Sequence, residues 1–290
     1  MELLSEWIVH ESPAGAVNAY LTRPRPASAP APAVIVIQEV WGVDGHIADV
    51  ADRFANAGYV ALAPDLYSAG GGRPAALAVE PVAAAKAFLN TLPTGQWMAV
   101  LGDEQRRAQA LSALPAAEAQ EVDATIRALF GGAGGDTARH VAVLRAAVAF
   151  LRAHPACAGR AVGSVGFCLG GSLSALLAGE RELGAAVVFY GSSPGAEQTG
   201  SIGCPLRGFY GHDDPRIVVG LPAFDAALAE AGVDHELRIY PDTPHAFFND
   251  TRPSYRPEAA RDAWGRTLAF FAEALGPVPT VPVREAAPAD

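Results

Sequence analysis

The 290-residue chain has little of what several classes of protein depend on. Its three cysteines, Cys157, Cys168 and Cys204, are too few for a disulfide framework and are not spaced as zinc ligands. Basic residues are also scarce, with 21 Lys and Arg against 31 Asp and Glu and a net charge of −10. No apolar run reaches the roughly 18 residues that a transmembrane helix needs. We therefore expect no metal site, no nucleic-acid partner and no membrane partner.

The composition otherwise fits a globular enzyme. Half of the residues are hydrophobic, which is enough for a sizeable core and argues against a mainly disordered chain. The first residues, MELLSEWIVHE, are acidic and lack the charged-then-apolar pattern of a secretory signal, so we expect a cytoplasmic protein. The sequence does not fix the oligomeric state, and we expect a monomer or a small homo-oligomer.

Short β-rich runs alternate with helical patterns along the chain, which predicts the α/β class: a mostly parallel central sheet with helices on both faces. The five apolar residues at 33–37 are typical of a strand buried on both faces. Strands are expected at residues 5–10, 16–22, 33–37, 59–62, 161–167, 185–190, 206–210 and 235–240. Helices are expected before Gly58, after residue 167, and at residues 137–153, 222–231 and 257–275.

Residues 68–136 interrupt this alternation. They contain two glycine clusters with Ala-rich helical stretches between them, and they are too long for a simple loop. We expect a helical insertion or cap within a single domain that spans residues 1–276. The remaining residues, 277–290, are rich in proline and acidic side chains and are expected to be disordered.

The segment at residues 165–171, Val-Gly-Phe-Cys-Leu-Gly-Gly, lies between a predicted strand and a predicted helix. In such a strand–turn–helix elbow, flanking glycines allow a tight turn that exposes the central nucleophile. The helix N-terminus would favour the Cys168 thiolate, and the backbone N–H of Leu169 would supply half of an oxyanion hole. The alternative is a buried structural cysteine beside a glycine turn.

An acid and a base follow at the ends of later predicted strands, in the order expected after such a nucleophile. Asp213 and Asp214 both qualify as the acid, and the spacing Gly-x-x-Asp from Gly211 favours Asp214. The alternative for either is an aspartate that caps a turn or helix. His245 lies in a proline-flanked loop after the last predicted strand, which favours a general base over a core-packing role.

Glu39 follows the apolar strand at 33–37 almost directly. A carboxylate is costly to bury at the tip of a central strand unless another group uses or pairs with it. In an α/β-hydrolase arrangement this tip provides the second oxyanion-hole N–H, here that of Val40, and lies close to Cys168. The alternative is a salt-bridged glutamate at the mouth of a loop.

Together these segments resemble the dienelactone hydrolase (carboxymethylenebutenolidase) family of α/β-hydrolases. The matching pieces are residues 38–42 (Gln-Glu-Val-Trp-Gly), 58–59 (Gly-Tyr) with 64–67 (Pro-Asp-Leu-Tyr), 166–171 (Gly-Phe-Cys-Leu-Gly-Gly), 211–214 (Gly-His-Asp-Asp) and 245–247 (His-Ala-Phe). The resemblance implies a triad of Cys168, His245 and Asp214. It also implies that Glu39 holds the thiol neutral until substrate binding yields a thiolate. The family activity is hydrolysis of an enol lactone to the keto acid maleylacetate, without metal or organic cofactor.

The resemblance also implies two arginines that bind the substrate carboxylate. The stretch Asp-Glu-Gln-Arg-Arg at 103–107 nominates Arg107, with a solvated helix face as the alternative. The second arginine is expected four residues after His245, where this chain has Asn249. An amide does not replace a guanidinium in a bidentate clamp, which weakens recognition of dienelactone more than ester hydrolysis itself. Trp41 and Asn249 complete the residues expected to contact substrate.

The leading hypothesis is therefore a hydrolase that cleaves a lactone or small carboxylic ester through a thioacyl-enzyme intermediate. A broad-specificity carboxylesterase or thioesterase would use the same triad with a different pocket. A non-catalytic, ligand-binding homologue and a redox-sensing thiol are further alternatives. The intact order of cysteine, aspartate and histidine argues against the first, and the absence of an evident resolving cysteine argues against the second.

Overall fold

The computed structural model describes residues 2–25, 29–93, 96–131 and 135–279. Its centre is an eight-stranded sheet with the order β1-β2-β4-β3-β5-β6-β7-β8. The strands are β1 (Glu2–His10), β2 (Val17–Arg25), β3 (Ala33–Ile37), β4 (Val60–Pro64), β5 (Val162–Phe167), β6 (Ala185–Phe189), β7 (Leu206–Gly211) and β8 (His235–Tyr240). Only β1 and β2 pair antiparallel with their neighbours. The expected mostly parallel sheet is confirmed, and all eight strands form close to their expected positions.

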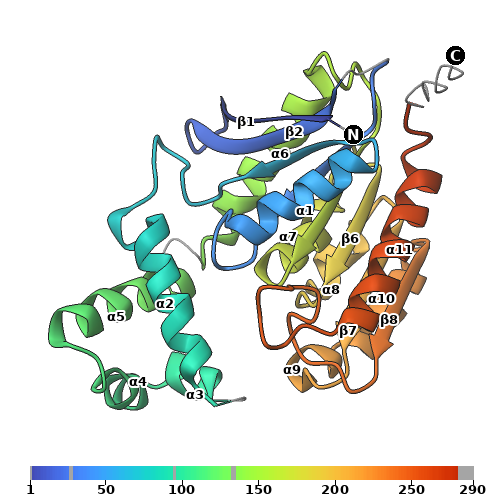
Figure 1. Ribbon diagram of the computed structural model, residues 1–290. Helices are drawn as coiled ribbons and strands as arrows, with labels where there is room; N and C mark the ends of the chain where they lie inside the picture. The colour runs from blue at the N-terminus through green and yellow to red at the C-terminus, as the bar shows by residue number, and fades with distance from the viewer. Residues whose placement is uncertain (1, 26–28, 94–95, 132–134, 280–290) are drawn as a thin grey trace, which may run out of the picture.

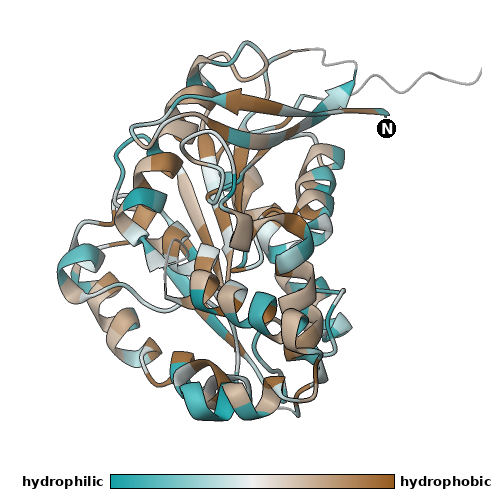
Figure 2. Ribbon diagram, turned by 90° about the vertical axis from the view of Figure 1, so that its left-hand side faces the viewer, coloured by the Kyte–Doolittle hydropathy of each residue, from teal (hydrophilic) through white to brown (hydrophobic). Residues whose placement is uncertain are grey.

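Helices cover both faces of this sheet (Figure 1). They are α1 (Gly45–Asn56), α6 (Thr137–Ala153), α7 (Leu169–Leu177), α8 (Ala196–Gly200), α9 (Pro215–Val218), α10 (Leu221–Glu230) and α11 (Pro257–Ala274). One core cluster packs α6, α7 and α10 against the sheet, and the other packs α1 and α11. Ile35 belongs to the first cluster and its neighbours Val34 and Val36 to the second, as strand alternation requires. Figure 2 shows the hydrophobic strands between these helical layers.

Residues between β4 and α6 form a separate group of helices to one side of the sheet (Figure 1). They are the 3₁₀ turn η1 (Ala75–Leu77) and the helices α2 (Val79–Thr91), α3 (Trp97–Gly102), α4 (Glu104–Leu111) and α5 (Ala116–Phe130). Their apolar core also includes Val40, Trp41 and Tyr67, which lie outside these helices. The insertion therefore packs against the loop that follows β3.

Among the described residues, none of the helices combines the length and the apolar character needed to cross a membrane. Most of the segment expected to be disordered, residues 277–290, lies outside the described residues.

Parallel pairing brings the ends of β3, β5, β6, β7 and β8 to one edge of the sheet. The side chains expected to act together follow these ends: Glu39 after β3, Cys168 after β5, Asp214 after β7 and His245 after β8. The carboxyl edge of a parallel sheet is the usual place for a binding site in such folds.

Candidate active site

Cys168 sits in a sharp turn between β5 and α7. Its φ of 54° and ψ of −111° lie in a region that few residues with a side chain adopt. The turn can close only because Gly166 and Gly170 lack a Cβ atom. A Cβ at Gly166 would overlap the backbone of Gly170, and one at Gly170 would overlap the carbonyl oxygen of Ile37. The glycine spacing seen in the sequence thus has a steric cause, and it leaves the Cys168 side chain partly exposed at the N-terminus of α7.

Asp214 and His245 meet beside this cysteine. The Oδ2 atom of Asp214 lies 2.5 Å from Nδ1 of His245, and Asp214 is 4% exposed. Asp213 is exposed and instead contacts the ring of its neighbour His212 at 3.3 Å. Of the two candidate acids, Asp214 is the one that the structure brings to the histidine.

The His245 imidazole is electrostatically coupled to both neighbours. Burial lowers its pKa, but the charge of Cys168, hydrogen bonds from the ring to Asp214 and Cys168, and the charge of Asp214 outweigh burial and raise the pKa to about 10. The negative charge of Asp214, and that of Cys168 when it is ionised, thus favour the protonated form of the His245 imidazole.

Glu39 is buried, with 2% of its surface exposed, and two neutral groups hold its carboxylate. The Tyr190 hydroxyl donates to Oε1 at 3.3 Å, and Nδ2 of Asn249 donates to Oε2 at 2.8 Å. Asn249 is fully buried, and its own side-chain oxygen accepts from Thr251. The structure thus assigns the amide of Asn249 to Glu39, in the position where sequence comparison placed a substrate contact.

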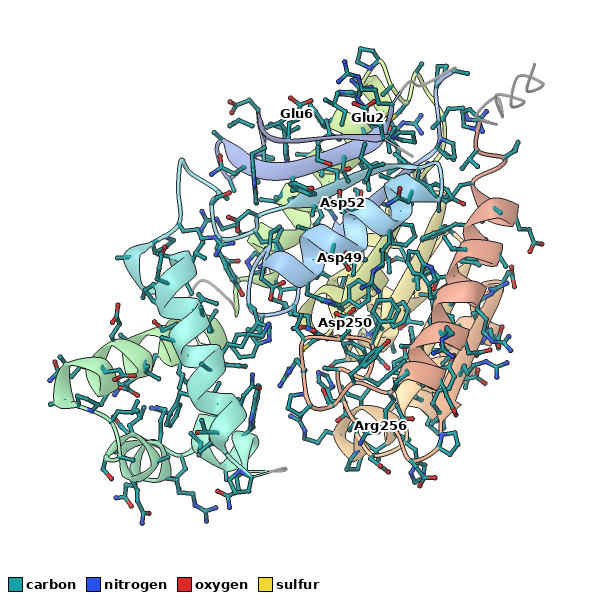
Figure 3. All side chains as sticks on the ribbon, in the orientation of Figure 1. Glu2, Glu6, Asp49, Asp52, Asp250 and Arg256 are labelled. Atoms are coloured by element: carbon teal, nitrogen blue, oxygen red, sulfur yellow. The ribbon has the colours of Figure 1, made fainter. Side chains whose placement is uncertain are left out.

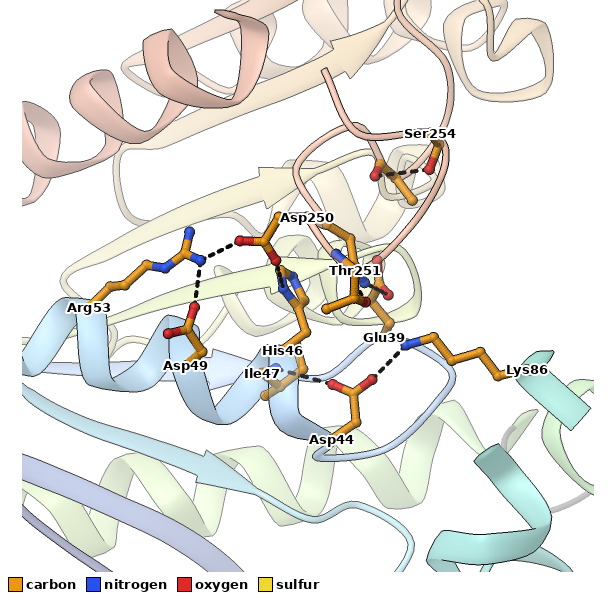
Figure 4. Close-up of polar contacts among 12 residues, drawn as sticks. Glu39, Asp44, His46, Ile47, Asp49, Arg53, Lys86, Asp250, Thr251 and Ser254 are labelled. Atoms are coloured by element: carbon orange, nitrogen blue, oxygen red, sulfur yellow. Dashed lines mark hydrogen bonds and ion pairs between the residues drawn. The ribbon is translucent and has the colours of Figure 1, made fainter. Parts of the chain in front are cut away.

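The loop that carries Asn249 is anchored to α1 by its next residue. Asp250 accepts a hydrogen bond from Arg53 at 2.6 Å and lies 3.4 Å from the ring of His46 (Figure 4). Arg53 also pairs with Asp49 on the same helix, and Figure 3 shows Asp49 and Asp250 on this side of the molecule. Desolvation raises the pKa of Asp250, but the hydrogen bond and charge of Arg53 and the neighbouring His46 leave it lower than usual.

The two backbone N–H groups predicted for the oxyanion hole belong to residues that directly follow Cys168 and Glu39 in the chain. Leu169 is the first residue of α7, where helical N–H groups have no intrahelical partner. In the loop after β3, the N–H of Gly42 donates to the Glu39 carbonyl at 3.2 Å. Because the peptide bond is trans, the Val40 N–H points away from that carbonyl. The oxyanion hole formed by these two N–H groups stays a prediction.

Arg107 does not join these residues. It is 8% exposed and donates to Asp123 at 2.6 Å and to the carbonyls of Val100 and Leu101, all within the insertion. The cation beside the site is Arg252, whose guanidinium lies 4.4 Å from the ring centroid of Trp97 and 5.8 Å from that of Trp41. Its Nε is buried without a hydrogen-bond partner among the described residues.

Three polar residues at this edge were not among the predicted site residues: Tyr67, Tyr190 and Arg252. Tyr190 directly follows β6, so its place at the carboxyl edge could have been read from the strand order. Arg252 is displaced by three residues from the position that the family pattern indicates, and only the turn after Asn249 brings it to Trp41. Within the described part of the chain, no group of three or more His, Cys, Asp or Glu is arranged to hold a metal ion.

Comparison with known proteins gives a consistent assignment. The model of the "Dienelactone hydrolase family" matches residues 17–275. A Saccharolobus solfataricus protein named "putative carboxymethylenebutenolidase" is 32% identical over 274 residues, covering 91% of this chain and 96% of that one. An Escherichia coli protein of the same name is 31% identical over 265 residues, with coverage of 87% and 81%. A Klebsiella pneumoniae structure described as "putative dienelactone hydrolase" superimposes with a TM-score of 0.71 at 26% identity, covering 94% of this chain and all of that one.

Proposed function

Because the chain belongs to the dienelactone hydrolase family, we propose that it hydrolyses a lactone or small carboxylic ester with Cys168 as nucleophile, His245 as base and acid, and Asp214 as the residue that orients His245. The observation that carries this proposal is the buried Asp214 carboxylate 2.5 Å from a histidine that also interacts with an elbow cysteine. The match over residues 17–275 and the α/β-hydrolase fold support the same reaction class.

The reaction proceeds in two acyl transfers. The Cys168 thiolate attacks the carbonyl carbon, and the oxyanion that forms accepts hydrogen bonds from the N–H groups of Val40 and Leu169. His245 then protonates the leaving alkoxide or enolate as the carbon–oxygen bond breaks, which leaves a thioester on Cys168. Water, deprotonated by His245, attacks the thioester, and the thiolate departs as the acid is released.

Glu39 acts in this proposal by controlling the charge of the thiol. Both Glu39 and Cys168 raise the pKa of Tyr190, so the carboxylate and the sulfur both lie near the Tyr190 hydroxyl. A negative carboxylate there disfavours the thiolate. Hydrogen bonds from the neutral Asn249 and Tyr190 hold Glu39 without cancelling its charge. Reorientation of Glu39 on substrate binding would then favour the reactive form of Cys168.

A broad-specificity carboxylesterase or thioesterase is the second candidate, and the position of the arginines favours it. Arg107 is engaged with Asp123, and an amide occupies the position of the second expected arginine. Arg73 and Lys86 also lie near this loop, but they pair with Asp65 and Asp44. We therefore assign attraction of a substrate anion to Arg252, whose buried Nε has no hydrogen-bond partner among the described residues, with Trp41 as an apolar wall beside it. One cation held by aromatic rings selects less strictly for a carboxylate than a bidentate pair.

Acyl-enzyme trapping tests the proposal. With p-nitrophenyl acetate, the wild-type protein should release nitrophenolate and gain one acetyl group on Cys168, detected by mass spectrometry of a quenched reaction. Cys168→Ala should lose both signals, whereas Cys204→Ala should keep them because Cys204 is a buried thiol beside Ala178, at the opposite end of α7 from the elbow. Hydrolysis by Cys168→Ala at the wild-type rate would exclude the proposed nucleophile. If the wild-type protein hydrolyses no lactone, ester or acyl thioester, the result would favour the non-catalytic, ligand-binding alternative.

A further inference from the structure

Residues that follow β4 brace the loop that follows β3. The Tyr67 hydroxyl donates to the Val40 carbonyl at 2.8 Å, a buried hydrogen bond between residues 27 positions apart. One residue earlier, the Leu66 N–H donates to the Gln38 side chain at 3.1 Å. Two contacts thus link the same two segments, and Tyr67 supplies the one that reaches the oxyanion-hole residue.

The Arg73 side chain also lies close to the end of this loop. Gly42 has a φ of +83°, and a Cβ atom there would lie 2.7 Å from Nη2 of Arg73. Arg73 is itself fixed by Asp65, whose Oδ2 lies 2.7 Å from its Nε. Two hydrogen bonds from the segment that follows β4 therefore hold the loop at residues 38 and 40, and the Arg73 side chain lies against its end at Gly42.

These contacts orient the Val40 N–H. The peptide before Val40 is fixed because the Glu39 carbonyl accepts from Gly42, and the peptide after it is fixed because the Val40 carbonyl accepts from Tyr67. Holding the planes on both sides of one residue leaves little freedom in its φ and ψ. A donor held in place before reaction stabilises an oxyanion without reorganisation.

Tyr67 is suited to this task. It is 2% exposed, and both burial and the neighbouring Cys168 raise its pKa, so the hydroxyl stays protonated and donates throughout the physiological pH range. Its ring packs in the core of the insertion together with Val40 and Trp41. The hydroxyl therefore makes a specific link in addition to the apolar packing of the ring.

We propose that Tyr67 is a positioning residue of the oxyanion hole, which fixes the Val40 N–H through its hydrogen bond to the Val40 carbonyl. The inference rests on the proposed function, because it concerns acyl transfer by Cys168. Removal of the hydroxyl should slow every step that forms an oxyanion and leave reactions without one unchanged.

Tyr67→Phe separates these two kinds of reaction. We expect kcat for p-nitrophenyl acetate to fall about tenfold with KM changed less than twofold, since removing an oxyanion-hole donor itself costs on the order of 10²–10³. Alkylation of Cys168 by iodoacetamide forms a carbon–sulfur bond as iodide leaves and creates no oxyanion. Its rate should therefore stay within twofold of wild type. A trifluoromethyl ketone, which adds to the thiolate to give an oxyanion, should bind about tenfold more weakly.

Tyr210→Phe is the matched control, because its hydroxyl is buried without a hydrogen-bond partner among the described residues. It should leave all three measurements at wild-type values. The inference is wrong if Tyr67→Phe keeps the wild-type kcat, if alkylation falls in parallel with kcat, or if Tyr210→Phe is slowed equally. Failure of the proposed function is distinguishable, because then either Cys168→Ala would retain hydrolysis or the wild-type protein would show none.

Discussion

The two sides of the candidate site are held by different kinds of contact. Around Cys168 and His245, backbone packs directly on backbone. A Cβ atom at Gly170 would overlap the Ile37 carbonyl oxygen, and one at Gly211 would overlap the Thr243 carbonyl oxygen. On the side of Glu39 and the insertion, side chains make the connections, as when Asn249 and Tyr190 hold Glu39.

This difference separates the residues proposed for catalysis from those proposed to select the substrate. Contacts between backbones tolerate no added atom, so the distances among Cys168, Asp214 and His245 follow from the sheet itself. Contacts between side chains can be exchanged without moving the sheet. Asn249 illustrates this, because it holds Glu39 at a position where the family pattern has an arginine. The substrate side can therefore change while the reacting groups keep their geometry.

Substitution at the backbone-packed side should have the largest effect. In Gly170→Ala the new methyl group would overlap the carbonyls of Ile37 and Gln38, so β3 and α7 could not both keep their positions. We expect loss of soluble protein or a fall of several kcal/mol in the free energy of unfolding, measured by urea denaturation. Gly265→Ala is the control, because Gly265 lies in α11 with nothing within 4 Å and alanine favours a helix. A Gly170→Ala protein as stable as Gly265→Ala would remove the steric basis of the comparison.

The next effect concerns the two neighbouring aspartates. Asp214→Asn should reduce kcat/KM for an aryl ester by 10²-fold or more, because the amide no longer fixes the ring or stabilises its charge. Asp213→Asn should change it less than twofold, since the Asp213 side chain is exposed and, within the described part of the chain, pairs with His212 rather than His245.

The same pair gives a pH prediction. Asp214 helps raise the pKa of His245 against the lowering effect of burial, so the wild-type imidazolium persists until the pH approaches about 10. In Asp214→Asn the imidazolium should lose its proton at lower pH. The alkaline limb of the activity profile should then move to lower pH, while that of Asp213→Asn should match wild type. A larger loss in Asp213→Asn would show that the acid is misassigned.

The side of the site held by contacts between backbones is easier to predict from the sequence than the side held by side chains. Gly166, Gly170 and Gly211 mark backbone contacts that nothing but glycine allows, so their spacing in the sequence carries the elbow and the acid loop directly. The central strands are predicted by continuous apolar runs, because both faces of the sheet are buried at β3, β4, β5 and β6. The short helices α8 and α9 were not predicted, since five and four residues are too few for a helical period.

The substrate side is less predictable because its contacts join residues far apart in the chain. Tyr190 and Glu39 are separated by 151 positions, and Asn249 and Glu39 by 210. No local pattern indicates that a buried amide will hold a carboxylate. Arg107 shows the opposite case, because its local stretch suggests a ligand site whereas the fold pairs it with Asp123 on α5.

The smallest expected effect concerns substrate charge, and it distinguishes the role of Arg252 from that of Arg107. Arg252→Gln should raise KM for an ester with a carboxylate on its acyl group by about tenfold, or ~1.4 kcal/mol, because the cation held by Trp97 and Trp41 is lost. KM for the matched neutral methyl ester should change less than twofold, and added salt should weaken the difference in wild type. Arg107→Gln should keep the wild-type preference and lower the free energy of unfolding instead, since Asp123 loses a largely buried partner. If Arg107→Gln abolishes the preference while Arg252→Gln retains it, the substrate anion is bound from the insertion, and the side-chain contacts of the substrate side rearrange when substrate binds.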